Sequence, residues 1–191
     1  MGKGPVSPRQ LLTYAAVAGL LLISRPRPAT YAAGCALAAA GIFFRVWGCG
    51  HLRKNVQFIT SGPYARVKHP LYLGTFLVAC GAIVAAGSPR FPSLVVWVVL
   101  GPVFLAVFFG YYLPKKRRVE GDRLIEYFGE DAREYVRTVP DFVPSLTRYP
   151  KASDLPWDYA TFRSNHELGM DLLIAALFLG LWFARGISPF G

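Results

Sequence analysis

The residues best suited to chemistry gather at the start of an apolar run. The stretch 60–74, TSGPYARVKHPLYLG, leads from a Gly-Pro turn through basic residues into Pro70. Proline fits the first turn of a helix, where its missing amide hydrogen is harmless, and the free amides there favour an anion such as a carboxylate. Lys68 and His69, directly before it, strengthen that preference. The stretch is therefore a candidate carboxylate-binding site.

Each residue of this stretch also has a simpler interpretation. Tyr64 and Tyr72 suit the aromatic belt of a membrane interface, and Lys68 suits the positive flank of a span. His69 suits a helix cap, and Gly74 suits close helix packing as well as close approach to a ligand. Taken singly, the residue types leave both interpretations open.

A second group of candidates lies in the acidic part of the chain. Glu120 and Asp122 occur early in a segment, 115–137, whose apolar residues recur at near-helical spacing and which Gly129 interrupts. Carboxylates here can hold a cationic group, or can simply be solvated near a helix start. The basic run 115–118, KKRR, suits an anchor on anionic lipid.

A third group of polar residues flanks or enters apolar runs. Arg45 is costly facing lipid, so it should face the bundle or reach the interface. Beside His51, an inward Arg45 suits the carboxylate or phosphate of a substrate. Glu167 lies four residues before Asp171, on the same helical face. Glu167 suits either a catalytic base or a structural pair with an arginine, Arg45 or Arg163.

The elements that must position these residues are membrane spans. Of 191 residues, 53% are hydrophobic and 17% are charged, and the mean hydropathy is +0.35. Apolar runs occur at about 11–24, 31–48, 70–87, 93–113 and 168–184. A helix needs about 20 residues to cross a bilayer, so the first run is short. The sequence predicts an all-α, polytopic membrane helical bundle of about five transmembrane helices, with a cytoplasmic helix between spans four and five, in a single domain.

The charge distribution predicts the orientation and excludes other classes. The net charge is +10, yet all eleven acids lie at or after Glu120. With five crossings, 17 Lys and Arg fall on the side of the N-terminus and four on the other, which makes that side cytoplasmic. A nucleic-acid binder can be equally basic, but these charges flank apolar runs, so no nucleic-acid partner is expected. Cys35, Cys49 and Cys80 lack metal-ligand spacing, so no metal site is expected.

Together, the motifs resemble those of a known family. The strings GPY (62–64) and KHPLYLG (68–74) are similar to the Gly-Pro-Tyr and Arg-His-Pro-x-Tyr-x-Gly signature of the isoprenylcysteine carboxyl methyltransferase and phospholipid methyltransferase superfamily. Lys68 stands where that signature has arginine. One span later, EGDRL (120–124) and the Phe-Gly pair at 128–129 resemble that superfamily's Glu-Glu-x-x-Leu-x-x-x-Phe-Gly pattern.

The second motif departs from the family pattern at one position. Gly121 stands where the pattern has its second acid, and Asp122 is one position further on. Asp122 is the expected substitute. The stretch 45–55 resembles the bacterial members of the superfamily, and the methyltransferase-like core extends over about 45–144.

The resemblance implies a reaction and a cofactor. It implies an integral membrane methyltransferase, of the bacterial inner membrane, that moves a methyl group from S-adenosyl-L-methionine to a lipid or lipid-linked acceptor at the cytoplasmic face. That acceptor is an isoprenylcysteine carboxylate or a phospholipid amine. The cofactor-binding residues it implies are Tyr64, Lys68, His69, Pro70, Tyr72, Gly74, Glu120 and Asp122. Among them, His69 is expected to hold the carboxylate end of the cofactor and Glu120 its amino end.

Candidates for the acceptor side follow from position alone. They are Arg45, His51 and Glu167. A carboxylate acceptor needs a cation, whereas an ammonium acceptor needs a base to remove its proton, so these residues leave the acceptor open. Two other functions remain: an NADPH-dependent membrane reductase similar to the sterol reductases, and a non-catalytic relative. The oligomeric state is not predicted.

Overall fold

The protein is all-helical in the part of the chain that the computed structural model describes. That part is residues 17–53, 58–165 and 167–184, and no strand occurs in it. Residues 17–23 are helical. The helices that follow are α2 (Pro28–Cys49), η1 (Gly62–Ala65), α3 (Pro70–Ala86), η2 (Val96–Leu100), α4 (Gly101–Val107), η3 (Phe108–Tyr112), α5 (Leu113–Thr138), α6 (Tyr159–Ser164) and α7 (Glu167–Ala184).

Helices α2 and α3 pack against each other through small residues. A Cβ on Gly34 would lie 2.4 Å from the carbonyl oxygen of Gly81, and a Cβ on Gly41 would lie 2.6 Å from that of Gly74. Any side chain at these positions would push the two backbones apart. Where lipid surrounds a bundle, such close backbone approach supplies the van der Waals contact that holds helices together.

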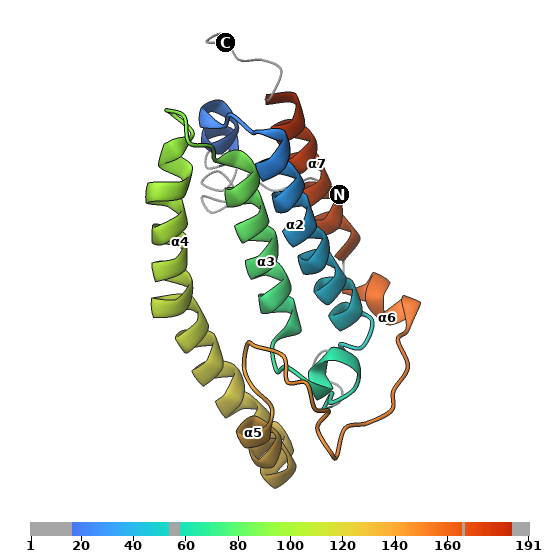
Figure 1. Cartoon of the computed structure of the whole chain (residues 1–191). Helices are drawn as coiled ribbons and strands as arrows, with labels where there is room; N and C mark the ends of the chain where they lie inside the picture. Colours follow the sequence, from blue (N-terminus) through green and yellow to red (C-terminus); the bar gives the residue numbers. More distant parts are fainter. Residues whose placement is uncertain (1–16, 54–57, 166, 185–191) are drawn as a thin grey trace, which may run out of the picture.

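Helix α7 packs against both α2 and α3. Its buried side chains Ile174, Phe178 and Leu181 join the core that Ala38 and Ala85 form between α2 and α3. Figure 1 shows α2, α3 and α7 side by side, with α4 on the other side of α3.

A long helix, Val96–Thr138, follows α3 and extends beyond the bundle. The π-helical turns η2 and η3 flank α4, and α5 continues from η3 at an angle to it. Gly129 has a left-handed φ of 65°, so it breaks α5 into two parts, as the sequence predicts. Phe76 of α3 packs against Phe108 of η3 and Phe142, with ring centroids 4.7 and 5.2 Å away.

The segment between α5 and α6, residues 139–158, forms a strap over the start of α3. The amide of Lys68 donates to the carbonyl of Pro140 at 2.9 Å, and that of Tyr149 donates to Ala65 at 2.8 Å. After the strap, Asn165 donates from Nδ2 to the carbonyls of Cys49 and Leu52, at 3.0 and 2.9 Å. Cys49 is the last residue of α2 and Leu52 lies just beyond it, so Asn165 binds both the end of α2 and the turn that follows.

The structure bears on each predicted span. Three helices among the described residues are long and apolar enough to cross a membrane: Pro28–Cys49, Val96–Thr138 and Glu167–Ala184. Helix α3 is apolar but has 17 residues, about 25 Å at 1.5 Å per residue. Of the predicted first span, 11–24, residues 11–16 lie outside the described residues, and 17–23 are helical. The all-helical architecture is confirmed, and the total of five spans stays a prediction.

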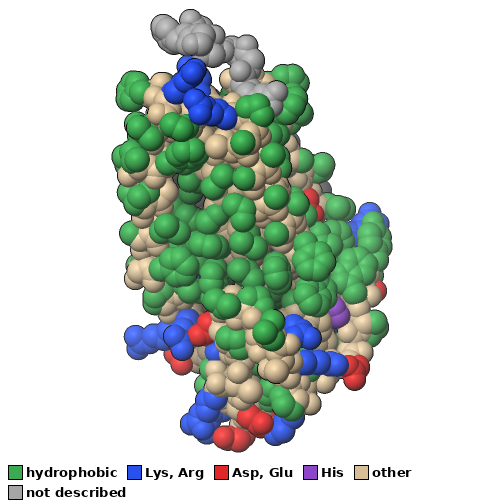
Figure 2. Space-filling model, in the orientation of Figure 1, with side chains coloured by type: hydrophobic (Ala, Val, Ile, Leu, Met, Phe, Trp, Pro, Cys, Tyr) green, Lys and Arg blue, Asp and Glu red, His purple; other side chains and the backbone are tan. Residues whose placement is uncertain are grey.

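Polar and apolar surfaces separate along the bundle. Figure 2 shows hydrophobic side chains covering the helices over most of their length, with a few basic side chains at the upper end and a larger mixture of acidic and basic side chains at the lower end. That end holds α5, η1 and the strap (Figure 1). The chain is therefore an integral membrane protein whose polar end carries the family-like motifs.

Candidate active site

A tight turn positions the first motif. Gly62 begins η1 with a left-handed φ of 57°, and a Cβ there would lie 2.3 Å from Nε2 of His51. Only glycine fits, both for its backbone angle and for the space. The turn buries Pro63 and Tyr64 and directs the following residues to Pro70, the first residue of α3. The motif therefore places its side chains at the start of α3.

A cavity of about 440 Å³ lies between this turn, the start of α3 and α5. Its volume is within the range typical of small-molecule sites. Polar side chains at one part of its wall include His69, Tyr72 and Glu120, and aromatic side chains include Phe58 and Phe128. The cavity thus combines a charged group with flat apolar surfaces.

Glu120 is the acid at the centre of the polar wall. Its Oε2 lies 3.1 Å from Nδ1 of His69, and its Oε1 accepts a hydrogen bond from the hydroxyl of Tyr72. Lys116, one turn earlier, approaches Oε1 to 3.7 Å. The side chain keeps 30% of its exposure, so it still faces the cavity.

The contacts of Glu120 keep it ionised. Glu120 lies past the apolar run, in the charged part of α5. Partial burial alone would raise its pKa, but hydrogen bonds from His69 and Tyr72 outweigh burial and lower the pKa below the ordinary value of a glutamate. A carboxylate fixed in this way is a suitable partner for an ammonium group.

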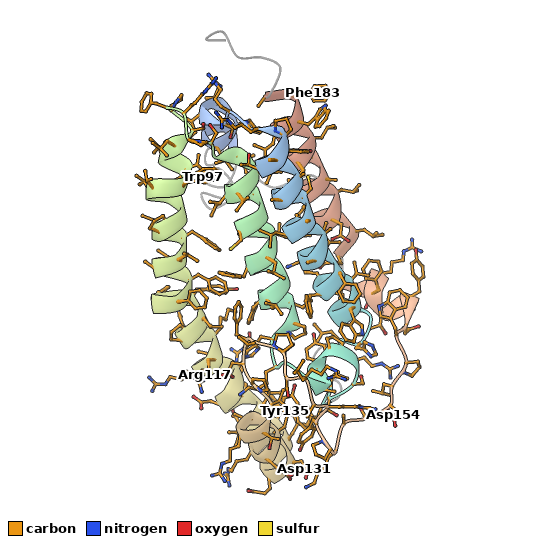
Figure 3. All side chains as sticks on the ribbon, in the orientation of Figure 1. Trp97, Arg117, Asp131, Tyr135, Asp154 and Phe183 are labelled. Carbon is orange, nitrogen blue, oxygen red and sulfur yellow. The ribbon has the colours of Figure 1, made fainter. Side chains whose placement is uncertain are left out.

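Aromatic rings form the floor of the cavity. Phe58 stacks on Phe128 with ring centroids 5.3 Å apart and meets the edge of Tyr135 at 5.2 Å. The hydroxyl of Tyr135 donates to the carbonyl of Tyr64 at 2.7 Å, which ties α5 to η1. Figure 3 labels Tyr135 at this meeting point of α5 and the loops. The ring contacts and this hydrogen bond therefore join Phe58, α5 and η1 in one wall of the cavity.

Lys68 connects the motif to α5 rather than reaching into the cavity with its ammonium. Its Nζ donates to the carbonyl of Val136 at 2.7 Å and lies 2.5 Å from Oδ1 of Asp141. Arg117 shares the same carboxylate, with Nε 2.7 Å from Oδ2. Lys68 lines the cavity, but its charge is used to hold the second half of α5 in place.

Most of the predicted cofactor residues meet at this cavity. Those that line it are Tyr64, Lys68, His69, Pro70, Tyr72 and Glu120. Gly74 lies elsewhere: a Cβ there would be 2.5 Å from Cγ of Arg45, so Gly74 belongs to the α2–α3 interface. Asp122 is on the wall of a second cavity on another side of α5, so it does not join Glu120.

The predicted acceptor-side residues lie outside the cavity, and two of them meet in the apolar part of the bundle. Nε and Nη2 of Arg45 donate to the two carboxylate oxygens of Glu167, at 2.5 and 3.0 Å. Nη1 of Arg45 donates to the hydroxyl of Thr75, and Cys49 Sγ lies 3.4 Å from Oε2 of Glu167. This arrangement is the structural pair that the sequence left as an alternative.

His51 supports the turn instead of facing the cavity. Its Nδ1 lies 3.0 Å from the hydroxyl oxygen of Ser61, and its ring fills the space beside Gly62. Burial lowers the pKa of His51, although a hydrogen bond with the backbone of Leu155 raises it, so the ring is neutral at pH 7.

Several lining residues were not among the predicted site residues. They include Leu52, Arg53, Phe58, Arg123, Leu124, Tyr127 and Phe128. Helical spacing from Glu120 was the available signal, because positions 123, 124, 127 and 128 lie three to eight residues after it on one face. Phe58 gave no such signal, since it lies in a loop.

Three curated proteins are similar to this chain. "Cobalt-zinc-cadmium resistance protein CzcN" of Cupriavidus metallidurans is 34% identical over 134 residues, 69% of this chain and 56% of that protein. "Nickel-cobalt-cadmium resistance protein NccN" of Alcaligenes xylosoxydans xylosoxydans is 28% identical over 153 residues, 75% and 64%. "Protein-S-isoprenylcysteine O-methyltransferase" of Schizosaccharomyces pombe is 27% identical over 119 residues, 61% and 45%.

These likenesses make the chain a distant homologue of an isoprenylcysteine methyltransferase and of two metal-resistance proteins. The chain spans about half to two thirds of the length of each. No family model matches the sequence, and no solved structure matches it. Among the described residues, no group of three or more His, Cys, Asp or Glu is placed to hold a metal ion.

Proposed function

We propose that this chain is a membrane methyltransferase that uses S-adenosyl-L-methionine and modifies a lipid or lipid-linked acceptor. The observation that carries the proposal is the ionised Glu120, held by His69 and Tyr72 on the wall of an aromatic cavity of about 440 Å³. The homology to an isoprenylcysteine methyltransferase supports it.

The cavity residues fit the chemical groups of this cofactor. A carboxylate matches the ammonium of the amino-acid end, so Glu120 is assigned to it. His69, at the positive end of the α3 dipole, suits the carboxylate of that same end. Phe58 and Phe128 offer stacked apolar faces to the adenine ring, and aromatic faces also favour a sulfonium cation.

The protein's own task in such a reaction is positioning. When bound, the cofactor supplies an activated methyl group, which an acceptor nucleophile takes in line. Glu120 and His69 fix one end of the cofactor, and the aromatic floor excludes water, so the reacting atoms are held together in a dry site. The side chains needed for this are already locked by Tyr72, Tyr135 and Lys68.

Calorimetric titration of the detergent-purified chain with S-adenosyl-L-methionine tests the proposal. Glu120→Gln should weaken binding at least tenfold, because it removes the negative charge and leaves the shape. Glu126→Gln is the matched control, since Glu126 is exposed on the same helix and lines neither cavity. Equal affinities of the three proteins would refute the assignment of Glu120.

The same titration separates the other functions. NADPH binding without S-adenosyl-L-methionine binding would identify a reductase, and binding of neither by folded protein would indicate a non-catalytic relative. If the methyl donor binds, labelled methyl transfer to an isoprenylcysteine analogue and to phosphatidylethanolamine tells a carboxylate acceptor from an amine.

The location and cellular role are also proposals. We infer a bacterial inner membrane location with the polar end in the cytoplasm from the excess of Lys and Arg on that side. Accessibility of a cysteine introduced at the exposed Arg137 to an impermeant thiol reagent in intact cells would contradict this orientation.

Homology to CzcN and NccN suggests a contribution to metal tolerance. Growth of a deletion strain on cobalt, complemented with wild type or with Glu120→Gln, tests whether that contribution needs the proposed site.

A further inference from the structure

A second cavity, of about 510 Å³, adjoins the first. Lys68, His69 and Leu124 line both cavities, so these side chains form a common wall. Glu120 and Tyr72, which define the polar wall of the first cavity, do not line the second. The second cavity therefore has its own chemistry, separate from the proposed cofactor site.

The lining of the second cavity changes from apolar to basic along one helix. Phe109, Leu113 and Pro114 belong to the end of the apolar run, and Arg117 and Arg118 follow within one turn. Figure 3 labels Arg117 near the point where α5 leaves the apolar helices. A lipid has the same order of groups, with an apolar chain next to a charged head at the membrane surface.

The basic side chains of this lining exceed its acids. Lys68, Arg117 and Arg118 face two acids, Asp122 and Asp141. Asp141 is shared, because both Lys68 and Arg117 lie within 2.7 Å of it. No acid lies within ion-pair distance of Arg118 among the described residues. The side chain of Lys68 is 6% exposed, so part of this positive charge is buried.

An open position lies beside these charges. Gly121 lines the cavity, and a Cβ there would meet only Cγ1 of Val136, at 3.9 Å. This is the position at which the sequence lacks the second acid of the Glu-Glu pattern. The wall therefore has room for an anionic group that the chain itself does not provide.

We propose that the second cavity binds the phosphate group of a membrane lipid. Arg118 and Arg117 bind the phosphate, since the planar guanidinium fork matches phosphate oxygens. The lipid chain lies along Phe109 and Leu113. The inference goes beyond methyl transfer and does not depend on it.

The test is native mass spectrometry of the full chain purified in a neutral detergent, titrated with short-chain phosphatidylglycerol or phosphatidylcholine in the absence of any methyl donor. Wild type should retain one phosphatidylglycerol in preference to phosphatidylcholine, and Arg118→Gln should reduce that retention at least tenfold. Arg137→Gln is the matched control, because Arg137 is an exposed arginine of the same helix outside the cavity. Equal retention by wild type and Arg118→Gln would overturn the proposal.

A substitution at the open position tests the place of the phosphate. Gly121→Glu puts a carboxylate there and should reduce retention at least tenfold, whereas Gly121→Gln, of the same size but neutral, should reduce it less. Both substitutions favour the helix, so both proteins should fold, which circular dichroism checks. Equal effects of Glu and Gln would overturn recognition by charge.

A soluble phosphate is the other source of the same chemistry. Inorganic phosphate and glycerol 3-phosphate, added at millimolar concentration, should leave the bound lipid in place. Their displacement of the lipid at concentrations similar to those of the lipid would overturn the lipid assignment. Since no methyl donor is present, these results are independent of the success or failure of the proposed methyl transfer.

Discussion

Two glutamates of this protein, each paired with neighbouring side chains, differ in what they can do. Glu167 lies in the apolar part of the bundle, where Arg45 binds both its oxygens and its side chain is 5% exposed. Glu120 lies at the polar end, where His69 and Tyr72 hold it but 30% of its side chain stays exposed to a cavity. Both carboxylate oxygens of Glu167 are occupied by protein partners, whereas the carboxylate of Glu120 remains accessible from the cavity.

The comparison indicates how a structural carboxylate in a membrane protein can be told from a ligand-binding one. A carboxylate that is fully paired in apolar surroundings has no capacity left for a ligand, and its loss leaves an uncompensated charge. A carboxylate that is oriented by neighbours but still open can accept a cationic group at little structural cost. Arg45 and Glu167 therefore hold helices α2 and α7 together, whereas Glu120 is available for binding.

The largest expected effect is on the pair in the apolar region. Glu167→Gln leaves the Arg45 guanidinium without its counter-charge, so the free energy of unfolding should fall by about 3–5 kcal/mol. Glu120→Gln should cost less than about 1 kcal/mol, as for exposed pairs. Denaturant unfolding of both variants in detergent measures the contrast.

A double variant controls for the pair itself. Arg45→Leu combined with Glu167→Leu removes both charges and should restore most of the stability that Glu167→Gln loses. Similar losses for Glu167→Gln and Glu120→Gln would erase the distinction between the two regions.

The next largest effect is a difference in stability between variants of two glycines, Gly74 and Gly121. Gly74→Ala places a Cβ 2.6 Å from the carbonyl oxygen of Gly41, so the free energy of unfolding should fall by about 1–3 kcal/mol through overpacking. Gly121→Ala makes only an ordinary van der Waals contact with Val136 and should raise helix stability by up to about 1 kcal/mol. Thermal unfolding of both variants measures this.

Cofactor titration of the same variants sharpens the role of Gly74. Folded Gly74→Ala should bind S-adenosyl-L-methionine as wild type does, because its backbone lies in the α2–α3 interface. Normal stability together with lost binding would return Gly74 to the cofactor site.

A smaller effect is expected at the neighbour of Glu120. Tyr72→Phe removes the hydrogen bond that orients this carboxylate, a contribution of about 0.5–1.5 kcal/mol, so cofactor affinity should weaken about 2- to 13-fold. Tyr111→Phe is the control, since Tyr111 is exposed to 62% and lines neither cavity. Equal calorimetric affinities of the two variants would contradict an orienting role for Tyr72.

The sequence predicted the helical architecture because its signals are local. The apolar runs at 31–48 and 168–184 correspond to helices α2 and α7, and Gly129 interrupts α5 as expected. The predicted cofactor residues that meet at one cavity, such as His69 and Glu120, come from motifs in two stretches one span apart.

What the sequence could not predict depends on side-chain direction between distant helices. Residue spacing does not show that Asp122, two residues after Glu120, lines another cavity. Nor does it show that Lys68 forms an ion pair with Asp141. Arg45 and Glu167 are separated by 122 positions, and their type and burial fit a pair and a catalytic site equally well until their distance is known.

The smallest expected effect is the pH dependence of the Glu120 contacts. Because the pKa of Glu120 is lowered in the folded protein, its stabilising contribution is complete at neutral pH and is lost as the pH falls through the folded pKa, below the ordinary range of a glutamate. The difference in free energy of unfolding between wild type and Glu120→Gln, under about 1 kcal/mol, should therefore persist to mildly acidic pH and close only in stronger acid. Denaturant unfolding of both proteins from pH 7 to pH 3 measures this, and a difference that disappears already near neutral pH would show that Glu120 is not the titrating group.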